Sequence, residues 1–271
     1  MTDPDGLTSV VWRWLPPAGT PTRAVLHVIH GWCEHGLRYD RPATALAAHG
    51  IAVYADDHRG HGETGRHNGT SGRLGPGGNE GAVEAVHAVS EAARAEHPGV
   101  PFFALGHSWG SLLLGRYLER WSDELDGAIL TGTTYRALGR EMPTDFNAKW
   151  SPPRTPYDWL TRDEAEVDTY IADPLCGFDA MQERFDEGDQ SKRGEDRPIR
   201  ADLPIHVLNG ADDPVGGEEG ARLLAAHYAG LGVTDVTWKA YAGARHELLN
   251  ETCRDEVLAD IQAWLDARID N

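Results

Sequence analysis

The sequence predicts an α/β domain with a mostly parallel central sheet covered by helices on both faces. Short apolar runs rich in Val, Ile, Leu and Ala recur along the chain, and segments of helical periodicity separate them. With 271 residues, 40% of them hydrophobic, the chain can bury one large core. The apolar runs predict strands at Val10–Leu15, Ala24–His30, Ile51–Asp56, Phe102–Gly106, Gly127–Thr131, Ile205–Asn209 and Val236–Tyr241.

The helices predicted between these strands are Tyr39–Ala48, Glu80–Glu96, Trp109–Trp121, Gly217–Leu231 and Asp255–Arg268. The alternation breaks down between about residues 135 and 200, where several prolines and the polar run Gln182–Arg197 occur. Two short helices are expected inside this stretch, at Asp163–Ala172 and Ala180–Asp186. We therefore expect a core formed by residues 1–134 and 201–271, and a small inserted cap formed by residues 135–200.

Composition excludes several classes of function. The chain carries 25 basic and 43 acidic residues, a net charge of −18, which disfavours a nucleic-acid partner. The three cysteines, Cys33, Cys176 and Cys253, have no C-x-x-C spacing, so neither a disulfide framework nor a zinc site is expected. The N-terminal residues do not resemble a signal peptide, and no apolar run is long enough for stable membrane insertion. We expect a cytoplasmic protein.

The sharpest local signal is the G-x-S-x-G run Gly106–Gly110, which follows an apolar strand and opens a helical segment. A serine on such a tight turn has strained backbone geometry and an exposed hydroxyl. The following helix directs its N-terminal amides toward charge that forms beside the serine. Ser108 is therefore the candidate nucleophile, and a glycine-rich turn with an incidental serine is the alternative.

A serine hydroxyl needs a histidine to take its proton and an acid to orient that histidine. Asp212 and Asp213 follow the strand Ile205–Asn209, and the register of the motif favours Asp213 over Asp212. His246 follows the last strand and is the candidate base, since His227 lies in the middle of a helix. These residues occur in the order Ser, acid, His that this architecture requires.

Acyl transfer also needs donors for the oxyanion, and the turn that begins at Gly31 after the strand ending at His30 can supply one. The backbone amides of Trp32 and Trp109 are the natural pair. Cys33 in the same turn could be mistaken for a nucleophile, but we interpret it as a packed thiol.

Two further runs contain the residue types of a metal site or a nucleotide-binding loop, but the spacing of their residues does not match such sites. The run Asp56–Gly62, with His67 beyond it, contains the residue types of a metal site, but its spacing favours a side-chain network that braces the active-site turn. The glycine-rich run Gly75–Gly81 has no preceding strand and no dinucleotide register, so we expect a loop. No metal and no cofactor are expected.

Together these residues resemble the α/β-hydrolase superfamily, and within it the bacterial monoacylglycerol lipase and lysophospholipase-like group. The matching segments are His30–His35 with Arg38-Tyr39, Asp57–Gly62, Gly106–Gly110, Asp158–Asp163, Asp173–Cys176, Asp213–Gly216 and Arg245–Glu247. The resemblance implies a serine esterase with Ser108 as nucleophile, Asp213 and His246 as its partners, and the Trp32 and Trp109 amides as oxyanion donors. It also implies a cap over the site, at the position of the irregular insertion.

We expect the substrate to be a small-molecule acyl ester that contacts His30, Gly31, Trp150 and Trp159, and the protein to be a monomer or homodimer. Compared with these relatives, the cap segments Tyr135–Trp150 and Phe178–Arg197 are short and polar. A lid for a long acyl chain needs a broad apolar face, because each buried CH₂ contributes about 0.8 kcal/mol. The cap offers few such residues: Leu138, Met142, Phe146, Trp150, Tyr157, Trp159, Phe178, Met181 and Phe185.

This cap predicts an open site that prefers short or bulky acyl esters to long-chain monoacylglycerols. Two other functions are compatible with the same residues. An open lid could admit a large acceptor, so the triad could transfer the acyl group to it or close a ring. A hydrolase-fold binding protein would keep the pocket without turnover.

Overall fold

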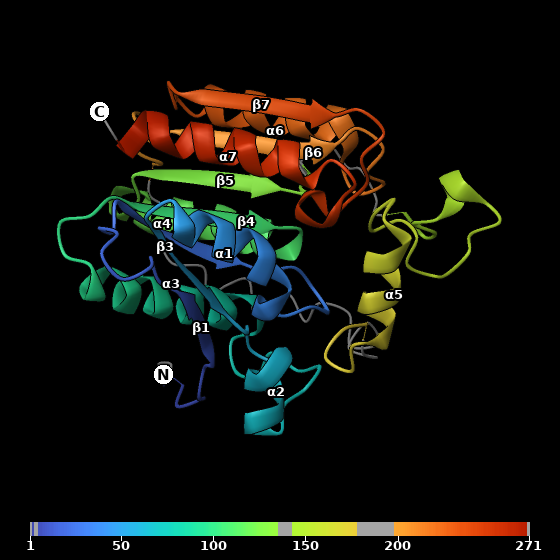
Figure 1. The fold of residues 1–271 in the computed structure, drawn as a ribbon, viewed down its shortest axis with the longest axis horizontal. Helices are drawn as coiled ribbons and strands as arrows, with labels where there is room; N and C mark the ends of the chain where they lie inside the picture. The colour runs from blue at the N-terminus through green and yellow to red at the C-terminus, as the bar shows by residue number, and fades with distance from the viewer. Residues whose placement is uncertain (1, 3–4, 135–142, 178–197, 270–271) are drawn as a thin grey trace.

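A seven-stranded sheet runs through the protein in the order β1-β3-β2-β4-β5-β6-β7 (Figure 1). The computed structural model describes residues 2, 5–134, 143–177 and 198–269. β1 is antiparallel to β3, and every other neighbouring pair is parallel. The strands are β1 (Val11–Trp14), β2 (Ala24–Ile29), β3 (Ile51–Asp56), β4 (Phe102–His107), β5 (Gly127–Thr131), β6 (Ile205–Gly210) and β7 (Val236–Tyr241). The predicted fold class is thus confirmed, with strand ends within one residue of those predicted.

Helices cover both faces of the sheet. They are α1 (Asp40–Ala48), α2 (Gly62–Asn68), α3 (Gly78–Glu96), α4 (Trp109–Trp121), α5 (Glu164–Ala172), α6 (Gly217–Gly230) and α7 (Arg254–Ile269), with short 3₁₀ turns η1 (Gly36–Tyr39), η2 (Ser122–Glu124), η4 (Ala148–Trp150) and η7 (Leu248–Asn250). α3, α4 and α6 enclose one core and α1 and α7 the other. Neighbouring residues of β2 enter different cores, Val25 the first and Leu26 the second. Burial on both faces explains the nearly continuous apolar sequence of this strand.

The segment 143–177, which contains α5, lies at the carboxyl ends of the strands. Figure 1 shows it in yellow-green, at the end of the sheet toward which the arrows of β5 and β7 point. The chain enters it after β5 and returns to the sheet at β6. Because the carboxyl ends of parallel strands carry the sites of α/β folds, this segment lies over the region where the candidate residues meet.

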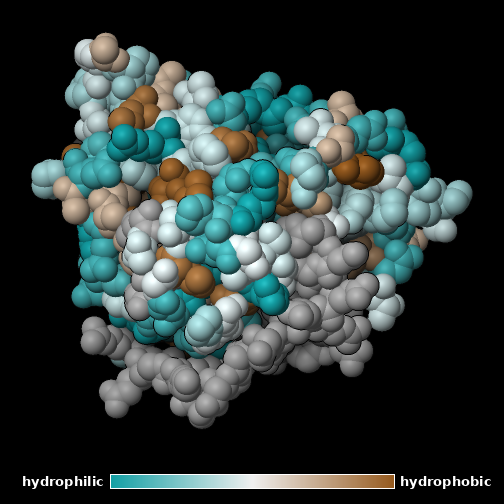
Figure 2. Space-filling model, turned by 90° about the horizontal axis from the view of Figure 1, so that it is seen from below, coloured by the Kyte–Doolittle hydropathy of each residue, from teal (hydrophilic) through white to brown (hydrophobic). Residues whose placement is uncertain are grey.

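The surface carries few large apolar side chains. Those that are exposed among the described residues are Leu15, Leu37, Ile171, Leu231 and Trp238. On the face drawn in Figure 2, hydrophobic residues form small separate groups among hydrophilic ones. Across the described part of the chain, no helix has both the length and the apolar character needed to cross a bilayer.

The sequence missed α2, and the starts of four other helices differ from the prediction, those of α5 and α7 by one residue. α1 begins at Asp40 instead of Tyr39, because residues 36–39 form the 3₁₀ turn η1. α3 begins at Gly78, inside the run predicted as a loop. α2 has no apolar stripe that periodicity could reveal. The helix predicted at Ala180–Asp186 lies outside the described residues.

Hydrogen bonds from outside the helix hold α2 in place. The Asp57 carboxylate accepts from the backbone N–H of Glu63 in the first turn of α2, at 2.7 Å. It also accepts from the Trp12 indole at 3.0 Å and from the Gly36 backbone at 2.9 Å. One buried carboxylate therefore joins β1, the turn after β2 and α2.

Replacement of Asp57 by Ala should destabilise the protein by roughly 2–4 kcal/mol, because it leaves three donors without an acceptor. Urea denaturation measures the loss. Asp202→Ala is the control, since its side chain is 81% exposed and its ion pair with Arg200 lies at the surface. A loss for Asp57→Ala no larger than for Asp202→Ala would show that this carboxylate does not join the three elements.

Candidate active site

The candidate residues come from loops at the carboxyl ends of four strands. Trp32 follows β2, Ser108 follows β4, Asp213 follows β6 and His246 follows β7. β2 and β4 are neighbours in the sheet, and so are β6 and β7. Parallel strands therefore bring together residues that are up to about two hundred positions apart in sequence.

Ser108 occupies a strained turn between β4 and α4. Its backbone has φ 52° and ψ −119°, in a region that non-glycine residues rarely adopt. Such a conformation costs roughly 1–3 kcal/mol and persists only where the surroundings impose it. The Ser108 N–H donates to the Thr131 carbonyl at 2.9 Å, and its own carbonyl accepts from Ser111 N at 3.0 Å. The adjoining strand and the helix thus fix the turn from both sides.

The two glycines of the motif are required because neighbouring backbone atoms leave no room for a side chain at either position. A Cβ on Gly106 would lie 2.6 Å from the Gly110 carbonyl oxygen. A Cβ on Gly110 would overlap the carbonyls of Ile29 and His30 at the end of β2. The start of α4 can lie against the end of β2 only without these side chains, which brings Ser108 close to the turn that carries Trp32.

Asp213 and His246 form a buried pair. His246 Nδ1 lies 3.0 Å from each carboxylate oxygen of Asp213, and the two residues are 2% and 5% exposed, respectively. Since a carboxylate only accepts, Nδ1 carries the proton and Nε2 is left with a lone pair. Burial opposes a charge on His246, but the Asp213 carboxylate outweighs it and raises the pKa of the imidazole. This is the arrangement of a general base.

Asp212, the other candidate acid, binds a different residue. Its carboxylate accepts from Lys149 Nζ at 2.6 Å, and its side chain is 34% exposed. Lys149 belongs to the inserted segment, so Asp212 binds this segment while Asp213 faces His246. The two adjacent aspartates therefore have separate partners.

A second histidine lies beside the pair. The ring centres of His107 and His246 are 4.8 Å apart. Burial, assisted by the neighbouring His246, lowers the pKa of His107 to about 4. Near neutral pH, His107 therefore stays uncharged and does not compete with His246 for the field of Asp213.

The turn after β2 is held from inside by Glu34. Its Oε1 accepts from Gly31 N at 2.5 Å and from the Tyr39 hydroxyl at 2.9 Å. Cys33, in the same turn, has a positive φ of 58°. The turn that carries Trp32 is therefore sharply folded around a buried carboxylate.

Arg38 joins this turn to the loop that carries His246. Its guanidinium donates to Glu34 Oε2 at 2.9 Å and to both carboxylate oxygens of Glu247, at 2.5 and 2.7 Å. Glu247 directly follows His246. The side chains of Glu34, Arg38 and Glu247 are at most 8% exposed. Burial disfavours ionisation of Glu247, but Arg38 outweighs it and lowers the pKa of this carboxyl to about 2. We call Glu34, Arg38 and Glu247 the Arg38 cluster.

The run Asp56–Gly62 forms a brace behind the turn. Asp56 accepts from His58 Nδ1 at 2.7 Å, and His58 N donates to His30 Nε2 at 3.0 Å. The opposite nitrogen of His30 donates to the Gly31 carbonyl at 2.7 Å. His30 is completely buried with both nitrogens used, so it holds Gly31 from behind and does not face a substrate, in contrast to the expectation from the sequence.

One cavity joins the candidate residues. Its described walls include Ser108, His246, Gly31, Trp32 and Trp109, and its volume is about 140 Å³. The rings of Trp32 and Trp109 meet edge to face, with centres 4.8 Å apart. The remaining apolar wall is formed by Leu112, Phe146, Tyr157, Trp159, Leu160, Tyr170 and Val215. Leu112, Leu160, Tyr170 and Val215 line the cavity although no motif or spacing in the sequence predicted them there.

Trp150 is not among the described residues that line this cavity. The guanidinium of Arg245 stacks over its ring, 4.3 Å from the ring centre. Trp150 thus binds the residue before His246, in contrast to the expected substrate contact. Trp159 does line the cavity, and its ring lies 4.8 Å from that of His246.

The inserted segment is bonded to both loops of the site. His246 N donates to the Trp159 carbonyl at 3.4 Å, and Glu247 N donates to the Leu160 carbonyl at 2.7 Å. At the other loop, the Cys33 carbonyl accepts from Gly177 N at 3.0 Å and from the Tyr170 hydroxyl at 2.9 Å. The walls of the cavity and the loops of the site therefore form one hydrogen-bonded unit.

The thiol of Cys33, which lines the cavity, is poorly suited to act as a nucleophile. Burial, with the Glu34 carboxylate nearby, raises the pKa of Cys33 to about 12. Since the thiolate is the reactive form, Cys33 stays largely protonated at neutral pH. None of the three cysteines forms a disulfide.

Comparison with known proteins agrees with this geometry. The family model Hydrolase_4, described as serine aminopeptidase, S33, matches residues 20–253. The chain belongs to this family. It is an α/β-hydrolase by fold as well: a carboxyl esterase from Bacillus coagulans, solved in complex with glycerol, superposes with a TM-score of 0.86 at 27% identity, covering 99% of this chain and 97% of the esterase.

Two curated lipases match this α/β-hydrolase over most of their own length. The monoacylglycerol lipase of Mycolicibacterium smegmatis is 30% identical, over 96% of this chain and 93% of the lipase. The human monoglyceride lipase is 28% identical, over 94% of this chain and 86% of its own length. The matches include the inserted segment as well as the sheet.

The Arg38 cluster should make the stability of this α/β-hydrolase depend on pH. The pKa of Glu247 is lowered from 4.5 to about 2, so its ionised form stabilises the fold above pH 4.5. That contribution is lost as the pH falls from 4.5 toward 2. Glu247→Gln should be less stable than wild type by roughly 3–5 kcal/mol at pH 7, and this difference should shrink on acidification.

Urea denaturation of both proteins between pH 7 and pH 3 measures this difference. Glu218→Gln, at an exposed position of α6, controls for the general loss of carboxylate charge. A wild-type advantage that stays constant over the whole range would contradict the assignment.

Proposed function

We propose that this protein is a serine carboxylic ester hydrolase in which Ser108, His246 and Asp213 act as a catalytic triad. The observation that carries the proposal is the buried Asp213–His246 pair, whose histidine lines the same cavity as Ser108 on its strained turn. The class, carboxylic ester hydrolase, is that of the esterase and the lipases similar to this chain.

In this mechanism the Ser108 hydroxyl attacks the ester carbonyl carbon while His246 Nε2 takes its proton. The imidazolium that forms is stabilised by the Asp213 carboxylate 3.0 Å from Nδ1. His246 then gives the proton to the departing alcohol, which leaves an acyl group on Ser108. Water, deprotonated by His246, attacks this acyl group, and His246 then returns the proton to the Ser108 oxygen as the acid leaves.

The backbone N–H groups of Trp32 and Trp109 are proposed to bind the oxyanion. Trp109 is the first residue of α4, so its N–H has no partner within the helix and lies at the positive end of the helix dipole. The Trp32 turn is fixed by Glu34 and braced by His30, so its donor needs little reorganisation.

The size of the cavity favours short acyl groups. Its volume of about 140 Å³ is well below the roughly 300–1,000 Å³ typical of sites for drug-sized ligands. The part of its wall that comes from residues 143–177 is largely aromatic, with Phe146, Tyr157, Trp159 and Tyr170. We propose residues 135–200 as the cap, although Leu138, Met142, Phe178, Met181 and Phe185 lie outside the described residues.

The described cavity offers no spare carboxylate for the free amino group of a peptide. Glu34 and Glu247 are its acidic lining residues in the described chain, and Arg38 binds both. An aminopeptidase must pair the substrate's N-terminal ammonium with an acceptor. Among the described residues this arrangement favours an ester over a peptide substrate.

Initial rates across an acyl series from acetyl to palmitoyl esters, including monoacylglycerols, test the proposal. Ser108→Ala should reduce kcat by about 10⁴-fold or more, because it removes the nucleophile and leaves only the oxyanion donors and substrate binding. A fluorophosphonate should label wild type and Cys33→Ser, but not Ser108→Ala. Rates should peak at short acyl chains.

The other outcomes separate the alternatives. Labelling without hydrolysis of any ester, together with acyl transfer from an ester to an added alcohol, would favour an acyltransferase. The absence of both labelling and turnover would indicate a binding protein. Equal kcat/KM for long and short chains would contradict the preference that we assign to the cap.

Phe146→Ala should shift the acyl preference toward longer chains. Phe146 lines the cavity and stacks on Trp159 with ring centres 4.5 Å apart, so its loss enlarges the cavity while leaving the triad residues in place. The ratio of kcat/KM for octanoyl and acetyl esters measures the shift. Leu231→Ala, an exposed position after α6, should leave the ratio unchanged, and an unchanged ratio in Phe146→Ala would remove this ring from the acyl site.

A further inference from the structure

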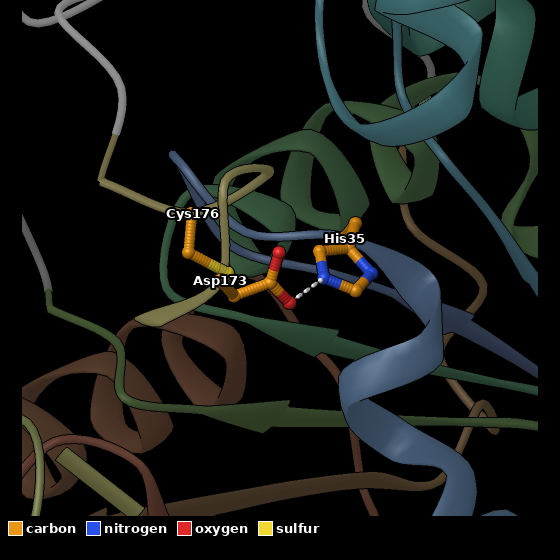
Figure 3. A group of neighbouring side chains, drawn as sticks. All are labelled: His35, Asp173 and Cys176. Carbon is orange, nitrogen blue, oxygen red and sulfur yellow. Dashed lines mark hydrogen bonds and ion pairs between the residues drawn. The ribbon is translucent and has the colours of Figure 1, made fainter. Parts of the chain in front are cut away.

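Three side chains from two distant parts of the chain converge beside the turn after β2. His35 lies at the end of this turn, and Asp173 and Cys176 follow α5 in the inserted segment. A ring nitrogen of His35, a carboxylate oxygen of Asp173 and the Cys176 sulfur all lie within 4.8 Å of one another. Figure 3 shows the carboxylate between the imidazole and the thiol-bearing side chain, with His35 Nε2 bonded to Asp173 Oδ2 at 2.8 Å.

The spacing of these atoms suits a tetrahedral ion. Zn²⁺ binds nitrogen, oxygen and sulfur at about 2.0–2.3 Å, which places the ligand atoms of a tetrahedron about 3.3–3.8 Å apart. The three ligand atoms, now within 4.8 Å of one another, reach that geometry through small shifts of their side chains. His35 and Cys176 are 5% and 9% exposed, so two of the three ligands are shielded from water.

The hydrogen bonds within the protein leave His35 only half satisfied. Its Nε2 bonds to Asp173, but its Nδ1 is buried and has no hydrogen-bond partner among the described residues. This nitrogen lies on the side of the ring away from Asp173 and Cys176, so the ion would be bound by Nε2 in place of its present bond to Asp173 (Figure 3).

The local charge also suits a divalent cation. A carboxylate and a thiolate balance the two charges of Zn²⁺, which matters because an unbalanced charge in a buried site is costly. The Arg38 cluster, which acts electrostatically on Cys176, contains two carboxylates and one guanidinium and therefore carries one net negative charge.

We propose that His35, Asp173 and Cys176 bind a zinc ion, with water as the fourth ligand. Coordination replaces the S–H bond of Cys176 with an S–Zn bond, and the proton passes to the buffer. The ion ties the inserted segment to the turn that carries Trp32. The inference does not rest on the proposed esterase activity, because its readout is metal binding.

Isothermal titration of the chelator-treated full chain with zinc chloride tests this site. Wild type should bind one ion per chain, and Cys253→Ser, which changes the thiol outside the cluster, should bind it equally well. Cys176→Ser and Asp173→Asn should each weaken binding at least tenfold. Thermal unfolding of every variant, followed by circular dichroism, verifies that it is folded.

Cobalt provides a second readout that identifies the sulfur ligand. With Co²⁺, wild type and Cys253→Ser should show near-ultraviolet thiolate charge-transfer absorption, and Cys176→Ser should not. Equal zinc affinity in wild type and Cys176→Ser, or a wild-type cobalt complex without thiolate absorption, would overturn the proposal. If Cys176→Ser does not fold, Asp173→Asn and the wild-type cobalt spectrum decide the question.

Discussion

The candidate site depends most on the buried ion pairs that the Arg38 guanidinium forms with two carboxylates. Arg38 binds Glu34, which folds the turn after β2, and Glu247, which directly follows His246. The ring of Tyr170 from the inserted segment lies against it, 4.8 Å from the guanidinium carbon. Burying these charges is costly, and removing one partner leaves another uncompensated, so the three parts hold their places together. The candidate oxyanion donor and the candidate base thus have one common anchor.

That anchor matters because Ser108 cannot adjust to its partners. Its positive φ is imposed by the hydrogen bond to Thr131 and by the close packing of Gly106 and Gly110. A strained residue held this tightly has a fixed position, and the loops on either side must be placed to match it. The brace of His30, His58 and Asp56 does this from behind the turn after β2, where the fully buried rings exclude water.

The sequence reveals those parts of the molecule that follow from local pattern. All seven strands could be predicted. The five inner strands, β2 to β6, are buried along their whole length and have nearly continuous apolar sequence, whereas the edge strands β1 and β7 are partly exposed. Ser108, Asp213 and His246 could be proposed from their order and their positions after strands. α2 could not be predicted, since bonds to Asp57 hold it instead of an apolar stripe. The partners of Arg38 lie 4 and 209 positions away in sequence, and its pairing with Glu247 becomes visible only in the fold. The same reason hides the cluster of His35, Asp173 and Cys176, and the burial of His30.

Main-chain bonds join the inserted segment to the loops of the candidate site, while its side chains line the cavity. His246 and Glu247 donate to the main-chain carbonyls of Trp159 and Leu160, and Gly177 donates to the carbonyl of Cys33. These bonds do not depend on which side chains the segment carries. The side chains of Phe146 and Trp159 line the cavity from the same segment. Substitutions there can reshape the cavity while main-chain bonds hold the loop of His246 and the turn after β2 in place. The proposed esterase can therefore change its substrate preference through the side chains of this segment alone.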